Sequence, residues 1–152
     1  MAIRPVPPAK LRLRFDAETC WWCRCCELVC SLTHEGVCSP ALSRIHIDLD
    51  QFKAEVKAGL CWQCGKPLCL YACPVPGAMT VDEATGARLI VPEKCTGCGV
   101  CAKACPFNKE GTVIRLNAER GIYVKCDLCG GQPACVETCP VNAIQTVTLK
   151  SA

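Results

Sequence analysis

The stretch Cys95-Thr-Gly-Cys-Gly-Val-Cys-Ala-Lys-Ala-Cys-Pro106 places four cysteines at gaps of two, two and three residues and follows the last one with a proline. The same arrangement occurs three more times in the 152 residues. Every group begins with C-x2-C and ends with C-x3-C, while the middle gap is two, four, two and five residues in chain order. The repeat therefore organises nearly the whole chain.

Sixteen of the eighteen cysteines belong to the four groups. The groups are Cys20, Cys23, Cys26 and Cys30; Cys61, Cys64, Cys69 and Cys73; Cys95, Cys98, Cys101 and Cys105; and Cys126, Cys129, Cys135 and Cys139. Cysteine makes up about 12% of the chain, above the level at which a short chain is normally read as cysteine-scaffolded. Without its cysteines the chain is only roughly 39% apolar, which is thin for a protein that must build its own core.

Disulfides and zinc are the alternatives for such a pattern. The N-terminal MAIRPVPPAKLRLRF lacks the apolar core of a signal peptide, and no stretch is apolar enough for a membrane span. We therefore expect a soluble chain in a reducing cytoplasm, where a cysteine pattern favours metal over disulfides. Zinc ribbons pair two C-x2-C knuckles in one tetrahedral site and do not use a third and fourth cysteine in the same run.

The run from Cys95 to Pro106 is typical of bacterial iron–sulfur proteins, in which three thiolates hold one cluster and the fourth reaches a different one. Close spacing lets a short loop hold three corners of a 4Fe-4S cluster. Gly97 and Gly99 allow backbone N–H groups to approach the sulfides, and the proline redirects the chain. Four such groups predict four 4Fe-4S clusters.

Hairpins are predicted between the groups. The apolar residues Met79 and Val81, and then Leu89 and Val91, flank a turn signal at 85–86, and a similar pattern spans 113–124. After the fourth group, CPVNAIQTVTL repeats the Cys-Pro, small-residue and apolar-strand order of CPVPGAM, which indicates two ferredoxin-like modules.

The link between the first two groups predicts a strand followed by a short helix. Apolar residues alternate with polar ones over 44–49, as in a strand with one buried face. In 50–59, Asp50 is a plausible N-cap, Phe52 and Val56 lie four apart, and Gly59 is a C-terminal stop, which favours a helix. The proline-rich residues 1–15 are expected to form an extended arm that gains order only against a partner or the body of the protein.

The four groups, with CTGCGVCAKACP as the third and a widened middle gap in the second and fourth, resemble the four-cluster electron-transfer subunits of molybdenum and tungsten oxidoreductases, formate dehydrogenases, hydrogenases and carbon monoxide dehydrogenases. The resemblance covers Cys20 to about Val147. The stretch CELVCSLTHEGVCSPALSRIHI is most similar to the small subunits of tungsten aldehyde oxidoreductases. The chain departs from the family pattern at Cys30, which Ser31 follows in place of proline.

The resemblance implies how the groups share ligands, with the first exchanging its fourth cysteine with the last, and the second with the third. The implied sets are Cys20, Cys23, Cys26 with Cys139; Cys61, Cys64, Cys69 with Cys105; Cys95, Cys98, Cys101 with Cys73; and Cys126, Cys129, Cys135 with Cys30. The spacing by itself equally permits two modules side by side.

The implied fold is α+β, with two bacterial ferredoxin-like two-cluster modules, one nested in the other, and with short β-hairpins and short helices. The outer module comprises 16–60 and 107–152, the inner module comprises 61–106, and the arm comprises 1–15.

Other residue types receive plainer interpretations. Cys25 and Cys38, outside the sets, are expected to be small buried hydrophobes. His34 and His46 are expected at the surface or beside a ligand, since every cluster already has four thiolates. The three tryptophans lie in cluster loops and are expected to shield clusters from water. The net charge of +3 comes without a basic run, which argues against nucleic acid.

The expected function is electron transfer without bond-making chemistry, because no Ser-His, paired-carboxylate or phosphate-loop constellation is visible in the sequence. The resemblance implies a tungsten- or molybdenum-containing catalytic subunit, oxidising aldehyde to carboxylic acid, as partner. Further expected partners are another redox subunit or a soluble acceptor such as a flavoprotein, and further copies of the chain. A free polyferredoxin, or a subunit of one of the other enzymes named above, is the alternative.

Overall fold

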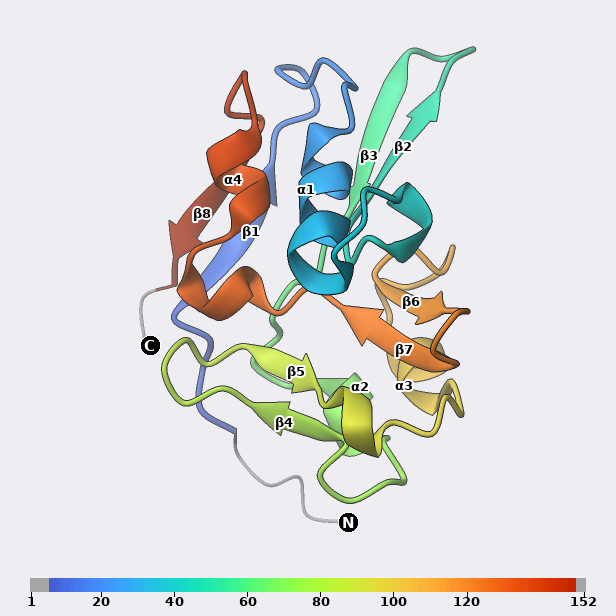
Figure 1. Ribbon diagram of the computed structural model, residues 1–152. Coiled ribbons are helices and arrows are strands. Elements are labelled where there is room, and N and C mark those ends of the chain that lie inside the picture. Colours follow the sequence, from blue (N-terminus) through green and yellow to red (C-terminus); the bar gives the residue numbers. More distant parts are fainter. Residues whose placement is uncertain (1–5, 150–152) are drawn as a thin grey trace.

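The computed structural model describes residues 6–149, which form short helices and two-stranded antiparallel sheets (Figure 1). These elements surround a cysteine-rich core. The α-helices are α1 (Cys25–Glu35), α2 (Leu68–Tyr71), α3 (Val100–Ala104) and α4 (Ala134–Thr138). Short 3-10 turns, η1 (Pro40–Leu42), η2 (Pro92–Lys94) and η3 (Leu128–Gly131), lie between them. This is the mixed α+β architecture that the sequence predicts.

Four antiparallel pairs make up the strands of the described residues. The pairs are β1 (Leu11–Phe15) with β8 (Ile144–Thr148), β2 (His46–Asp50) with β3 (Glu55–Gly59), β4 (Met79–Val81) with β5 (Arg88–Ile90), and β6 (Ile114–Asn117) with β7 (Ile122–Lys125). The hairpins predicted around 79–91 and 113–124 are confirmed, as are the strands predicted within 44–49 and after the fourth cysteine group.

The pairing of β1 with β8 joins the two ends of the described chain (Figure 1). Phe15 lies opposite Ile144, and Leu11 lies opposite Thr148. The part of the predicted arm that contains β1 is therefore packed on the body of the protein, while 1–5 lie outside the described residues.

The prediction of a helix over 50–59 is wrong, because this segment forms a turn followed by strand β3. The Asp50 carboxylate accepts hydrogen bonds from the backbone N–H groups of Phe52 and Lys53, at 3.1 and 3.2 Å. Asp50 thus closes a turn instead of capping a helix. Val56 is buried opposite Leu49, whereas Phe52 is fully exposed at the tip of the hairpin. The four-residue spacing of Phe52 and Val56 is therefore not the spacing of one helical face.

The core mixes aliphatic side chains with thiols. Ile45, Ile114, Leu128 and Ile144 are almost fully buried, and they share one cluster of contacts with seven buried cysteines. Helix α1 packs against α4, and α2 packs against α3. Each helix pair thus encloses cysteines from two different sequence groups.

Candidate metal centres

Each α-helix carries the C-x3-C half of one group. Cys26 and Cys30 lie on α1, and Cys69, Cys101 and Cys135 lie on α2, α3 and α4. Their partners Cys73, Cys105 and Cys139 follow just after those helices end. Residues four apart project from the same side of a helix about one turn apart. One helix can therefore place two thiols in two neighbouring cavities.

The C-x2-C loops share an unusual backbone. The residue just before the second cysteine has a positive φ in all four loops: 58° at Trp22, 49° at Gln63, 69° at Gly97 and 64° at Leu128. Only one of these four is glycine, and a bulky residue in this region carries strain that the surrounding structure must offset. Sequence reasoning missed this feature, since tryptophan, glutamine and leucine give no signal for a left-handed turn.

Three cavities are each lined by four cysteines of the predicted sets. One is lined by Cys20, Cys23, Cys26 and Cys139, a second by Cys61, Cys64, Cys69 and Cys105, and a third by Cys73, Cys95, Cys98 and Cys101. Their remaining walls are mainly apolar, with Phe15 and Ile144 in the first, Phe107 and Val113 in the second, and Met79 and Ile90 in the third. In each cavity, three of these four cysteines come from one group and the fourth comes from another, and Cys25 also lines the first cavity.

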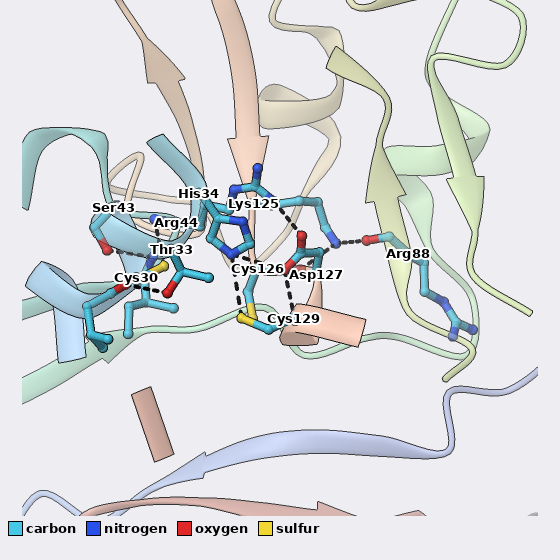
Figure 2. A network of polar contacts seen from close by, with 12 residues as sticks. Cys30, Thr33, His34, Ser43, Arg44, Arg88, Lys125, Cys126, Asp127 and Cys129 are labelled. Atoms are coloured by element: carbon cyan, nitrogen blue, oxygen red, sulfur yellow. Dashed lines mark hydrogen bonds and ion pairs between the residues drawn. The ribbon is translucent and has the colours of Figure 1, made fainter. Parts of the chain in front are cut away.

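The other four cysteines, Cys30, Cys126, Cys129 and Cys135, also come together. The charge of Cys30 acts on the pKa of both Cys129 and Cys135, and that of Cys135 acts on Cys126. Figure 2 shows the polar groups beside them. The backbone N–H of Arg44 donates to Cys30 Sγ at 3.4 Å, and His34 Nε2 lies 3.5 Å from Cys129 Sγ.

Burial dominates the electrostatics of the thiols. It raises the pKa of Cys26 and of Cys135 to about 12, and the pKa of Cys69 and of Cys101 to about 11. Metal binding at these positions must displace the protons, because the thiolate is the ligand. The sites are therefore suited to metals that bind thiolate strongly.

Cys139 differs from the buried thiols. Burial raises its pKa, but backbone N–H groups, led by that of Ile144, outweigh this effect and lower the pKa overall. The N–H of Ala143 donates to Cys139 Sγ at 3.2 Å. Such donors stabilise negative charge on sulfur, as expected for a cluster ligand.

Two observations indicate that the residues lining these cavities suit 4Fe-4S clusters. Each set offers four thiols, the ligands that these clusters use. Arg88 is 1% exposed, lines the cavity of Cys61 and has no hydrogen-bond partner for its Nε within the described residues. A buried donor of this kind requires an acceptor, which a cluster sulfide would supply.

Residues outside the sets correct parts of the sequence interpretation. Cys38 is exposed and Cys25 is only partly buried, so the prediction that both are buried hydrophobes is wrong. Cys38 lies in an exposed segment without regular structure after the end of α1, and Cys25 is the first residue of α1 and also lines the first cavity. Trp21 and Trp62 line cavities, although 72% and 50% of their surface is exposed.

His34 lies beside the proposed ligand Cys129, and His46 contacts the residue that follows the proposed ligand Cys26. His34 contacts Cys129 and Asp127, and burial lowers its pKa. The metal-binding atoms of His34, Asp127 and Cys129 lie within 4.8 Å of one another, but Asp127 is also paired with Arg44. His46 Nδ1 lies 3.0 Å from the buried carboxylate of Glu27, the residue after Cys26.

The fold and cysteine sets define an iron–sulfur protein, and comparison with known proteins gives the family. The sequence model of the 4Fe-4S dicluster domain matches residues 52–149, and the chain belongs to this family. Two curated relatives are similar to it. The polyferredoxin-like subunit of an aliphatic sulfonate oxidoreductase from Pyrococcus furiosus is 46% identical over 80% of this chain and 67% of its own length. The iron–sulfur subunit of the nitrate-inducible formate dehydrogenase of Escherichia coli is 34% identical over 93% of this chain and 55% of its own length.

The chain thus spans about half to two thirds of the length of these relatives. Among solved structures, the active-site complex BamBC of benzoyl coenzyme A reductase with zinc contains a similar chain. The TM-score is 0.53 with 26% identity, covering 93% of this chain and 80% of that one. No helix within residues 6–149 has the length and apolar character needed to cross a bilayer.

Proposed function

We propose that this protein is a non-catalytic electron-transfer subunit that holds four 4Fe-4S clusters through sixteen cysteines. The observation that carries the proposal is the lining of the three cavities, each made by three cysteines of one group and one of another. The sets are those implied by the family resemblance, and the contacts around Cys30 support the fourth. The proposed fold is correspondingly one ferredoxin-like module nested inside the other.

The proximity of the sets supports a linear order. Helices α2 and α3 together serve the sets of Cys95 and Cys61, and helices α1 and α4 serve those of Cys126 and Cys20. The charge of Cys61 acts on the pKa of Cys126, which joins the inner pair to the outer pair. The proposed order is therefore the Cys95 set, the Cys61 set, the Cys126 set and the Cys20 set.

The exposed ligands lie at the two ends of this order. Of the sixteen proposed ligands only Cys23 and Cys98 are exposed, and they belong to the Cys20 and Cys95 sets. When bound, each cluster would accept and release one electron at a time. The two middle sets contain no exposed cysteine, and each end set contains one, which marks the two ends as the proposed docking points for partner proteins.

The partner that we propose is a tungsten- or molybdenum-containing catalytic subunit. The resemblance of the first cysteine group favours oxidation of an aldehyde to a carboxylic acid, and the relative from the aliphatic sulfonate oxidoreductase of Pyrococcus furiosus favours an aliphatic sulfonate as a second candidate. Electrons would leave for a further redox subunit, a flavoprotein or another copy of the chain. The cluster-type spacing of the cysteines, whose thiols bind iron only when reduced, supports a cytoplasmic location.

The test is anaerobic affinity purification from the native host, with iron, tungsten and molybdenum measured on all that co-purifies. We expect about sixteen irons on this chain, at four per cluster, and a larger partner with tungsten or molybdenum. Assays with an artificial acceptor, using aldehydes and aliphatic sulfonates in parallel, then identify the substrate class. A fully loaded chain without a partner would instead mean a mobile polyferredoxin, and fewer irons would contradict the count of four.

A further inference from the structure

Two buried cations occupy the junction between the Cys61 set and the Cys126 set. Arg88 on β5 is 1% exposed and Lys125 at the end of β7 is 2% exposed. Both side chains line the cavity of Cys61, Cys64, Cys69 and Cys105. Lys125 also directly precedes Cys126 in the chain, so it lies between two proposed clusters.

The side chains of Lys125 and Arg88 donate their hydrogen bonds to uncharged backbone carbonyl oxygens. Lys125 Nζ donates to the carbonyl oxygens of Arg88 and Cys126, and Figure 2 shows the first of these bonds. The guanidinium of Arg88 donates to the carbonyl oxygens of Gly86 and Pro7. Within residues 6–149, neither side chain forms an ion pair with a carboxylate.

Gln63 fixes this arrangement. It is 2% exposed, its Nε2 donates to the Cys126 carbonyl at 3.0 Å, and its Oε1 accepts from the Arg88 backbone N–H at 2.8 Å. The loop of the Cys61 set, strand β5 and the loop of the Cys126 set are thereby held together. The two cations cannot swing out to solvent without breaking this buried network.

A buried cation is costly unless a negative charge compensates it. The ionisable groups that interact with these cations are cluster thiols. Burial is the largest influence on the pKa of Cys69 and of Cys105 and raises both values, whereas the charge of Lys125 acts to lower them. Burial lowers the pKa of Arg88, and the charges of Cys64 and Cys61 act to raise it. The unpartnered Nε of Arg88 also indicates an acceptor in this cavity.

The cavity of the Cys95 set offers the contrast. Its lining contains cysteines, apolar residues, Thr96, Gly99 and Tyr123, and no lysine or arginine within the described residues. The inner module therefore combines one thiol set that faces two buried cations with a neighbouring set that faces none.

We propose that Lys125 and Arg88 are fixed positive charges that raise the reduction potential of the cluster held by Cys61, Cys64, Cys69 and Cys105 above that of its neighbour at Cys95. This inference rests on the proposed function. Reduction adds one electron, supplied by the catalytic partner in the cell or by dithionite in the test, and the added negative charge is stabilised by the adjacent cations. An electron arriving at Cys95 would then move inward toward the junction with the outer module.

The test is an anaerobic redox titration, monitored by electron paramagnetic resonance, of the protein as isolated with its partners. Lys125→Met removes the charge and keeps most of the stem, whereas Lys103→Met removes an exposed lysine between ligands Cys101 and Cys105. Cys64→Ser changes the signal of the cluster in question and so identifies it among the others.

We expect Lys125→Met to make reduction of one cluster less favourable by at least a factor of ten in the equilibrium constant. This lowers the midpoint potential of that cluster by about 59 mV for one electron. The shifted signal should be the one that Cys64→Ser alters, and Lys103→Met should leave all midpoints in place. Full iron content with unshifted midpoints in Lys125→Met overturns the inference, as does a shift confined to another cluster.

If Lys125→Met binds less iron, Arg88→Gln provides the same comparison, because it removes the second cation while keeping a polar group. It should lower the same midpoint, and an unshifted midpoint there also overturns the inference. Failure of the proposed function is distinguishable, since it appears in the wild-type protein as missing iron, whereas failure of this inference appears only in the variants.

Discussion

At the scale of single residues, the cluster loops depend on backbone conformations as much as on thiols. Gly97 has a φ of 69°, and a Cβ at this position would lie 2.1 Å from the carbonyl oxygen of Gly121 in the β6–β7 turn. The sequence suggested that this glycine admits backbone N–H groups to the sulfides. The structure adds a second reason, which is the close approach of another loop.

We expect Gly97→Ala to destabilise the iron-loaded protein by more than the ~1–2 kcal/mol that a left-handed conformation alone costs a residue with a Cβ. Gly65→Ala is the matched control, because Gly65 follows Cys64, has no positive φ and has open space around its Cα. The measurement is chemical denaturation followed by the visible absorbance of the clusters. Equal denaturation midpoints for the two variants would contradict the packing argument.

At the scale of secondary-structure elements, one side chain organises the connection between α3 and β6. Asn108 Oδ1 accepts from the backbone N–H groups of Val113 and Ile114, both at 2.8 Å, and its Nδ2 donates to the carbonyl oxygens of Ala102 and Ile114. The loop that follows Cys105 is thus tied to both of its flanking elements.

Asn108→Ala should destabilise the protein by about 2–4 kcal/mol, because four hydrogen bonds are lost and their backbone partners are left unsatisfied. Asn108→Asp keeps the acceptor oxygen and loses the two donated hydrogen bonds, so we expect it to lower the stability by less than Asn108→Ala does. Denaturation of both variants beside Lys109→Ala, an exposed neighbour, checks the order. A loss for the alanine variant no larger than that for Lys109→Ala would show that the bonds contribute nothing net.

At the scale of the whole molecule, segments from near the two ends of the described chain line one cavity. Strand β1 pairs with β8, and the charge of Cys139 acts on the pKa of Cys20, which burial raises. The spacing of the cysteines alone left the nested and side-by-side arrangements equally open. The cavity that contains both Cys20 and Cys139 favours the nested one.

We therefore expect Cys139→Ser and Cys20→Ser to alter the same cluster signal in electron paramagnetic resonance, with the other signals kept. Cys25→Ser is the control, because Cys25 also lines that cavity but lies outside the proposed set. If Cys139→Ser instead altered the signal that Cys95→Ser alters, the modules would lie side by side.

The sequence by itself determined the thiol groups, the iron–sulfur chemistry and most of the hairpins, because these depend on spacing within a few residues. Its local rules failed at 50–59, where a helical spacing of two apolar residues was overridden by the pairing of β3 with β2. They also failed at Cys38, whose exposure depends on the turn after α1 rather than on its residue type.

Only the tertiary structure decided which groups line a common cavity and what surrounds the thiols there. Cys20 and Cys139 come from opposite ends of the chain, and Lys125 and Arg88 converge from separate hairpins. Such contacts depend on how the elements pack, and no local spacing encodes them. The buried charge at the junction is for this reason invisible in the sequence, where Lys125 is one lysine among several beside a cysteine.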